Sequence, residues 1–250
     1  MNLEQRVDDE GLLVLHAVDL TDVTFPAERI RSLGIGVGSR LVRCDLRGLR
    51  LEGGGFGSGS EISRYEDCVF DGSRLVGTLP GRATFVRCSF RDVSFRQVFF
   101  QDAEFVDCVF SGSMEKVVFN AKPTSAEQLG RVKNVYRGND FTHAEMFDVT
   151  FRGGVDLDLQ KLPRDPRLVI IKNAGRRIER AFEFFSRMPD GPVRRNATMV
   201  LELLMEECDN GQDDLLVSRE VLGENAMLLI EAIGDSANSD NIITTFRTGR

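Results

Sequence analysis

The sequence predicts a mainly β protein built as a solenoid, followed by a smaller α-helical region. Phenylalanine recurs at every fifth position from 85 to 110, and a small or compact side chain stands two residues before each ring. After residue 172 this period gives way to apolar residues at helical spacing. The first two observations predict the solenoid, and the third predicts the helices.

The five-residue period defines the expected core. A helix buries side chains with a period of 3.6 and a strand with a period of two, so neither accounts for a period of five. A square coil does, if each side has five residues and turns inward its central residue and the residue two before it. An ordinary β-sandwich rich in Phe, the alternative, would show alternation and irregular gaps. The predicted core residues are Phe85, Phe90, Phe95, Phe100, Phe105, Phe110, Cys68, Cys88 and Cys108.

The segment 83–110, ATFVRCSFRDVSFRQVFFQDAEFVDCVF, resembles the repeats of the pentapeptide-repeat family. Their motif is A(D/N)LXX with Leu or Phe at the centre. The resemblance implies a right-handed quadrilateral β-helix of a bacterial protein, in which four pentapeptides form a coil of about twenty residues.

The N-terminal elements fit such a coil with interruptions. Residues 1–17 predict a strand that starts or caps the stack, and repeats begin at 18–25. Residues 26–36 predict a short helical turn with a glycine stop. The pattern returns at Cys44 and meets the glycine-rich stretch 52–60, which we expect to be a loop leaving a corner. No Lys-Ser/Thr follows these glycines, so phosphate binding is not expected.

The repeat is clean from Ser63, weakens after Phe110 and resumes from Phe141 to Phe151, giving about five to six coils. Pro80 occupies one centre and has no amide for the ladder, so we expect that side to bow outward. Residues 120–135 break the period and predict a loop with a capped helical turn. The strand 167–171 is expected to cover the open end. Residues 1–172 are thus predicted to form the β-helix with its N-terminal cap.

Residues 173–250 are predicted to form an α-helical C-terminal domain. Helices are expected at 173–187 and from Pro192 to Gly211, where the glycine ends the helix. A third helix is expected to begin at Ser218, which would cap its N-terminus. Residues 235–250 are expected to be a loose tail.

Composition limits the class of protein. The chain has 250 residues and a formal net charge of −7, which argues against a broad basic surface for nucleic acid. No apolar run reaches the length of a membrane span, and acids replace the basic region of a secretory signal. Cys68, Cys88 and Cys108 should stack in the interior; a metal or disulfide is conceivable, but the absence of a CxxC motif favours packed free thiols. Free thiols suggest a cytoplasmic protein.

The sequence shows no catalytic pattern. His143 is expected at a solvated corner, and no nucleophile elbow or cofactor motif is present. We therefore expect neither an enzyme nor a cofactor or metal.

The outer surface is where function is expected. We predict a scaffold that acts by protein–protein interaction with an unidentified protein. The sequence also leaves open whether the chain forms a homodimer. The family resemblance implies an alternative, a DNA mimic that binds gyrase and protects it from topoisomerase inhibitors. A continuous negative stripe would favour mimicry, and alternating Arg and Asp columns a general scaffold. The candidate contact residues are Phe99, Asp102, Glu104, Asp107, Asp140, Glu145, Asp148, Asp156 and Asp158.

Overall fold

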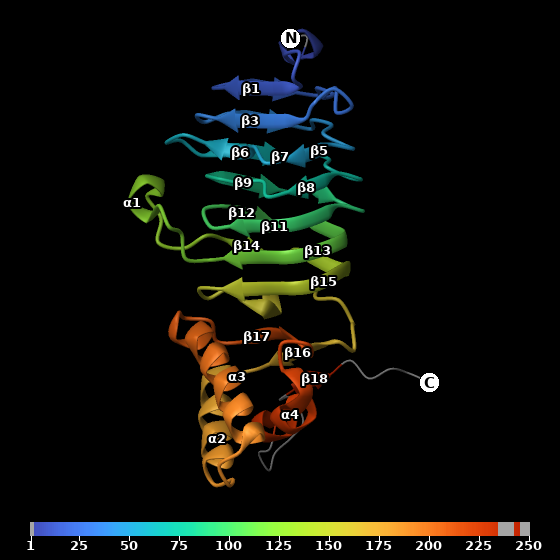
Figure 1. The fold of residues 1–250 in the computed structure, drawn as a ribbon. Helices are drawn as coiled ribbons and strands as arrows, with labels where there is room; N and C mark the ends of the chain where they lie inside the picture. Colours follow the sequence, from blue (N-terminus) through green and yellow to red (C-terminus); the bar gives the residue numbers. More distant parts are fainter. Residues whose placement is uncertain (1–2, 235–242, 246–250) are drawn as a thin grey trace. The chain divides into compact units, whose positions relative to one another are not determined.

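The computed structural model describes residues 3–234 and 243–245 (Figure 1). The chain forms two compact units: Met1–Val149 with Val155–Pro163, and Thr150–Gly154 with Arg164–Arg250. The first unit is a stack of parallel coils, and the second contains helices around a small antiparallel sheet. Each unit is described separately below.

Parallel strands form three ladders along the coil stack. One ladder contains β2 (Asp19–Thr21), β4 (Arg40–Val42), β7 (Ser63–Glu66), β9 (Ala83–Val86), β12 (Glu104–Val106) and β14 (Tyr136–Arg137). A second contains β5 (Arg50–Glu52), β8 (Arg74–Val76), β11 (Ser94–Phe100), β13 (Val109–Asn120), β10 (Ser89–Phe90) and β15 (Asp140–Arg152). The third contains β1 (Leu12–His16), β3 (Ser32–Gly36) and β6 (Gly55–Ser58).

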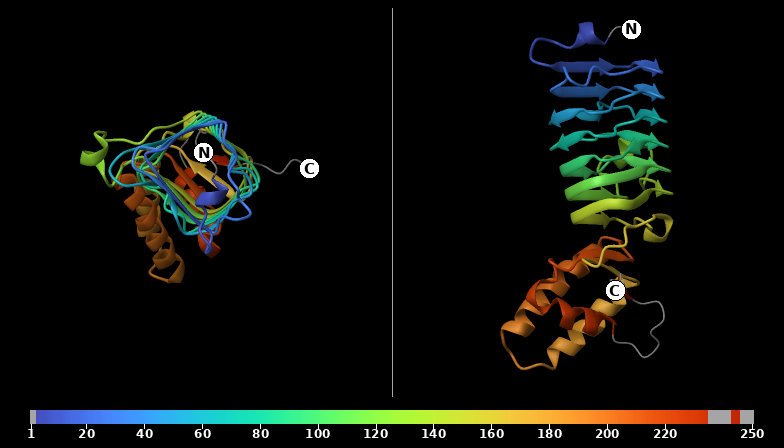
Figure 2. Two further views of the ribbon diagram at one scale, coloured as in Figure 1. Left: turned by 90° about the horizontal axis from the view of Figure 1, so that it is seen from above. Right: turned by 90° about the vertical axis from the view of Figure 1, so that its right-hand side faces the viewer.

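Seen along its axis, the stack has the four-sided outline expected of a quadrilateral β-helix (Figure 2, left). Single residue bridges, such as Val69 with Ser89, connect the coils on the side that has little strand structure. The predicted fold class is confirmed. The short 3-10 helices η1 (Glu4–Arg6) and η2 (Leu157–Leu159) also belong to this unit.

The interior is filled by stacked aromatic rings. All six phenylalanines of the predicted period are buried, with at most 3% of the residue surface exposed. Phe85 stacks on Phe105 with ring centroids 4.8 Å apart, and Phe90 stacks on Phe110 at 5.0 Å. These separations match the distance of about 4.8 Å between neighbouring strands. Each of these four rings therefore lies over a ring one coil of twenty residues away.

Four cysteines form a second interior column: Cys44, Cys68, Cys88 and Cys108 are all buried and free. The Cys68 thiol donates to the Leu41 carbonyl oxygen at 3.4 Å, and Cys88 donates to that of Tyr65 at 3.5 Å. Burial raises the pKa of Cys88 well above its usual value. Residues 3–234 and 243–245 contain no cluster of three or more His, Cys, Asp or Glu side chains suited to a metal ion.

The structure corrects two predictions near the N-terminus. Part of the stretch 52–60 is not a loop, because residues 55–58 form β6, paired with β3. Its glycines allow close backbone approach: a Cβ on Gly55 would lie 2.6 Å from the Leu79 carbonyl oxygen. The expected helical turn at 26–36 is likewise confined to its first half, since residues 32–36 form β3.

The prediction that the side around Pro80 bows outward is wrong. Pro80 is buried, and the amides of Leu79 and Arg82 each donate at 2.8 Å to carbonyl oxygens of the preceding coil, Gly54 and Gly57. Proline removes only its own donor, so the flanking amides are sufficient to hold this side in the ladder.

The loop expected at 120–135 is present and contains α1 (Ala126–Leu129). The helix ends at Gly130, whose φ of 62° lies in the left-handed region that glycine adopts without strain. This loop leaves the stack at a corner (Figure 1).

The second unit combines helices with a three-stranded antiparallel sheet. The sheet has the order β17 (Leu215–Ser218), β16 (Leu168–Ile171), β18 (Ile243–Thr245). The helices are α2 (Ala174–Ser186), α3 (Pro192–Asp209) and α4 (Ala226–Gly234), with η3 (Gly223–Asn225) before the last. The apolar faces of α2 and α3 share one buried core with the sheet, in which Ile178, Phe185 and Leu201 have at most 1% of their surface exposed.

Two of the three predicted helices are present, and the third begins later than predicted. Ser218 ends β17 instead of capping a helix, because Leu215, Leu216 and Val217 are buried and pair with β16. The strand expected at 167–171 is present as β16 within this sheet and hence within the second unit. The division at residue 172 into two domains stays a prediction. The predicted loose tail lies mostly outside the described residues, apart from β18.

Candidate protein-contact surface

Acidic and basic side chains alternate along one edge of the coil stack. From β2 to β12, the position two residues after each centre of the β2–β14 ladder holds, in order, Asp22, Arg43, Asp67, Arg87 and Asp107. Arg43 donates two hydrogen bonds to Asp22, at 2.7 and 2.6 Å, and Arg87 donates two to Asp67, both at 2.8 Å. These bonds lower the pKa of both carboxyl groups. We call these five residues the charge column.

Several other charged positions of the solenoid are paired in a similar way. Arg47 contacts Asp45 at 2.5 Å, Arg74 contacts Glu52 at 3.2 Å, and Arg96 contacts Glu115 at 3.3 Å. Each pair places opposite charges on one coil or on adjacent coils. The charge on these sides of the rod is therefore locally balanced.

Two of the predicted contact residues, Asp102 and Glu104, anchor the loop 121–135. Asp102 accepts hydrogen bonds from the amide and hydroxyl of Thr124 and from the Ser125 amide, at 2.8 to 3.1 Å. Burial would raise its pKa, but the bonds from Ser125 and Thr124 outweigh burial, and the pKa lies below its usual value. Glu104 contacts the Arg131 guanidinium at 2.7 Å, with both side chains less than a fifth exposed.

Buried amides complete this anchor. Asn134, with 1% of its surface exposed, donates to the carbonyl oxygens of Gln101 at 2.6 Å and Asn120 at 2.8 Å. Arg131 also donates to the Asp102 carbonyl oxygen at 2.9 Å. Asp102 and Glu104 thus hold the loop in place, and their carboxylates are already engaged. This role could not be predicted from the sequence, because the partners of Asp102 and Glu104 follow more than twenty residues later.

The remaining predicted acids do not form a stripe. Asp140 accepts from the Thr142 amide at 3.0 Å and contacts Lys161 at 3.3 Å, and Asp156 caps η2 by accepting from the Asp158 amide at 2.9 Å. Asp107, Glu145, Asp148 and Asp158 are exposed at their surface positions. Asp140 and Glu145 belong to consecutive sides of one coil, so they do not continue each other along the rod.

One side of the stack lacks charge at its outward positions. Val14 pairs with Gly34, Gly34 with Gly55, and Gly55 with Leu79. Phe99 follows Leu79 by twenty residues and likewise stands one residue before a buried centre. We call Val14, Gly34, Gly55, Leu79 and Phe99 the apolar column.

The large side chains of the apolar column are open to solvent. Leu79 is 69% exposed, Phe99 46% and Val14 43%. Phe99 was predicted as a contact residue, and the structure places it facing outward. Leu79 and Val14 were missed, although Leu79 could have been found by subtracting one twenty-residue coil from Phe99.

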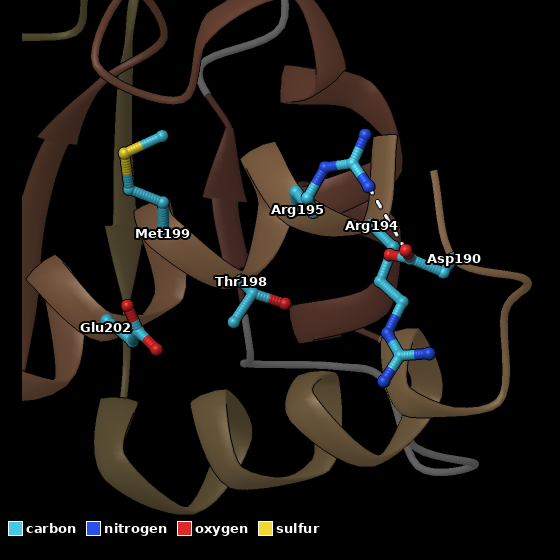
Figure 3. A pocket seen from close by; sticks show the side chains of 6 residues that line it. All are labelled: Asp190, Arg194, Arg195, Thr198, Met199 and Glu202. Atoms are coloured by element: carbon cyan, nitrogen blue, oxygen red, sulfur yellow. Dashed lines mark hydrogen bonds and ion pairs between the residues drawn. The ribbon is translucent and has the colours of Figure 1, made fainter. Parts of the chain in front are cut away.

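The second unit has a shallow groove of about 350 Å3 along the first turns of α3 (Figure 3). Arg195 donates to Asp190 at 3.1 Å, and Arg194 donates to the Met188 carbonyl oxygen at 3.2 Å. Met199, 56% exposed, is the main apolar side chain of its lining. The groove is open, and its two arginines already have partners, so it offers less than the apolar column as a contact site.

These features define a repeat solenoid with exposed apolar and charged side chains on its outer surface. Residues 81–112 match the family model described as Pentapeptide repeats, in 8 copies, and the chain contains pentapeptide repeats. A search of curated proteins finds no match. Within residues 3–234 and 243–245, no helix combines the length and apolar character needed to span a bilayer.

Solved structures of QnrB1, described as a plasmid-mediated fluoroquinolone resistance protein, are similar to this chain. A trypsin-treated form is 13% identical, with a TM-score of 0.32, over 60% of this chain and 79% of that chain. The full-length form is 16% identical, with a TM-score of 0.27, over 60% of this chain and 82% of that chain. Similarity at this level carries no statement about function.

Proposed function

We propose that this protein is a non-enzymatic scaffold that binds another protein through the apolar column. One observation carries the proposal: Leu79 and Phe99 stand in line on an uncharged side of a rigid rod, with much of their surface exposed. Exposed apolar side chains that are contiguous mark interaction sites more often than scattered ones do. Aromatic residues in particular are enriched at the centres of protein interfaces.

The solenoid suits such a role because its surface is preformed. Each coil is held by amide–carbonyl bonds to its neighbours, and the stacked rings fix the interior. A partner therefore pays little ordering entropy on the solenoid side. The lack of charged groups in the apolar column also means that binding there requires little desolvation of ions.

The alternative, a gyrase-binding DNA mimic, is less well supported by the charge distribution. Duplex DNA carries one negative charge per roughly 1.7 Å of axis, so a mimic needs acids that follow one another along the rod. In the charge column Asp22 and Asp67 are each followed by an arginine one coil away, and both of these pairs are bonded. Purified protein at micromolar concentration should leave gyrase supercoiling unchanged; inhibition or drug protection would favour the mimic.

The proposal also places the protein in a reducing compartment such as the cytoplasm. All five cysteines are free, and four are buried in the column described above. Free thiols in this number are typical of compartments that keep cysteine reduced.

Site-specific photo-crosslinking tests the binding proposal. A photoreactive amino acid at position 99 should give a discrete adduct with one other protein in extracts of the source organism. The matched control is position 132 in the loop, where Val132 is 88% exposed but lies outside the apolar column. The adduct at 99 should weaken when Leu79→Ser is added. Equal adducts from both positions, or none from 99, would contradict the proposal.

A further inference from the structure

We infer that the apolar column also packs against the same column of a second copy of this chain, with the two rods antiparallel. The inference rests on the proposed function, because it names a partner for the same surface. It is based on the order of large and small residues along the column, on the absence of charged groups there, and on the open space at Gly34.

Large and small residues are separated along the column. The order from the N-terminal coil is Val14, Gly34, Gly55, Leu79 and Phe99, so two glycines precede two large side chains. A two-fold axis between the coils of Gly55 and Leu79 reverses this order in the second copy. Leu79 then faces Gly55 of the other copy, and Phe99 faces its Gly34. Both large side chains meet a glycine, which is the self-complementarity that an isologous interface requires.

Gly34 has room for a partner side chain. Gly34 is half-buried, and a Cβ built on it would meet only Val14 Cγ2 and Cγ1, at 3.8 and 3.9 Å. Its outward side is therefore open. Gly55 is half-buried as well, but a Cβ on it would lie 2.6 Å from the Leu79 carbonyl oxygen, so Leu79 of the other copy would lie on a flat backbone surface and not in a gap.

Charge favours this side for self-association. The chain carries a net charge of −7, so two copies repel each other in general. The outward positions of this side carry no Asp, Glu, Lys or Arg, so no like charges meet and none lose water. These positions are Leu12, Val14, His16, Gly34, Gly55, Leu79, Gly81, Phe99 and Gln101.

The area of the apolar column determines how strongly two copies are expected to associate. Five coils extend over four steps of about 4.8 Å, and a side of five residues spans roughly 16 Å, which gives a projected area of about 300 Å2 per copy. Stable complexes bury about 800 Å2 per partner. We therefore expect a weak dimer that forms and dissociates rapidly, with a dissociation constant on the order of tens of micromolar.

Sedimentation velocity of the full chain tests the inference. Between about 2 and about 200 µM, the weight-average sedimentation coefficient should rise from that of the monomer toward that of the dimer. Gly34→Glu fills the gap facing Phe99 and adds charge, and Leu79→Ser removes a large side chain that is mostly exposed. Each should weaken association at least tenfold, whereas Val132→Ser should leave it unchanged. Far-UV circular dichroism verifies that each variant is folded.

Disulfide trapping tests the antiparallel register. In a Cys208→Ser background, which removes the only cysteine that is not fully buried, Gly34→Cys protein is mixed with Phe99→Cys protein. Oxidation should link the two variants to each other faster than it links either to itself. Faster self-linkage of either variant would overturn the register.

A monomer across the whole concentration range, or unchanged association of both Gly34→Glu and Leu79→Ser, would overturn the inference. The proposed function is tested separately by the photo-crosslink at position 99. A monomeric protein that still gives an adduct with a different protein refutes only the self-association. A monomer with no adduct at 99 refutes both.

Discussion

Replacing Phe105 with alanine should destabilise the solenoid more than any change on its surface. Phe105 has 0% of its surface exposed. Its ring stacks on Phe85 at 4.8 Å and meets the Phe100 ring edge-to-face at 4.9 Å, with further rings at 5.4 to 6.1 Å. The substitution removes the ring from the middle of the aromatic stack, where the coils above and below cannot close without shifting their own strands.

The magnitude follows from cavity formation. Substituting a buried Phe by Ala in a packed core costs about 3 to 5 kcal/mol. Because Phe105 has ring neighbours on several sides, we expect about 4 kcal/mol, in the upper half of that range. In a chain of this size the melting temperature should fall by about 10 °C.

Tyrosine fluorescence provides an assay specific to the solenoid. The chain has two Tyr and no Trp. Tyr65 and Tyr136 are 0% and 5% exposed, and both contact rings of the aromatic stack. Urea unfolding followed by tyrosine emission therefore reports on the solenoid without signal from the second unit.

Phe99→Ala is the matched control, because it makes the same chemical change at a ring that is 46% exposed. It should cost about 1 kcal/mol or less. Equal losses for Phe105→Ala and Phe99→Ala, or a loss below about 1 kcal/mol for Phe105→Ala, would refute the view that stacked rings along the axis hold the coils together.

Three further predictions concern the loop, the charge column and the thiols. Asp102→Ala removes the acceptor of three hydrogen bonds, so trypsin should cleave the loop 121–135 at least several-fold faster than in Asp107→Ala, whose carboxylate lies outside the loop anchor. The pKa of Asp102 is lowered in the folded state, so its contribution to the stability of the loop is present above the unfolded value near 3.9 and is lost as pH falls through the lowered pKa. Hydrogen exchange of the loop amides should therefore accelerate in that pH range. A rate of exchange that does not change there would contradict the role of Asp102 as an anchor. Arg87→Glu places three acids in succession along the charge column and should lower the urea midpoint at low salt but hardly at high salt; a loss independent of salt would argue against an electrostatic cause. A thiol reagent should modify native protein at Cys208 alone, and slowly, because burial raises its pKa to about 11; rapid reaction of the four buried thiols before unfolding would show that the cysteine column is accessible.

The aromatic interior could be predicted because it depends on a short local period. Any five-residue side must turn its centre inward to bury it, whatever the neighbouring coil contains. The period therefore predicted the burial of Phe85 to Phe110 without knowledge of the coil register. The glycine-rich stretch 52–60 was predicted less well, because glycine both permits turns and allows strands to approach closely, and only contacts distinguish the two.

The outer surface could not be predicted in the same way. Successive coils differ in length: Leu41 pairs with Tyr65, twenty-four residues on, and Phe105 pairs with Tyr136, thirty-one residues on. The register between Cys44 and Cys68, which sequence left open, is fixed by the pairing of Asp45 with Val69. These insertions leave at corners and keep the interior in line, but they change which outward residues become neighbours.

The amino-acid sequence by itself determined that this chain is a solenoid with rings along its axis, because burial of each ring is decided within its own five residues. Only the tertiary structure decided that Asp102 and Glu104 hold a loop, that arginines stand beside the acids of the charge column, and that Leu79 lines up with Gly55. These neighbours come from different coils, and the length of chain inserted between coils sets which of them meet.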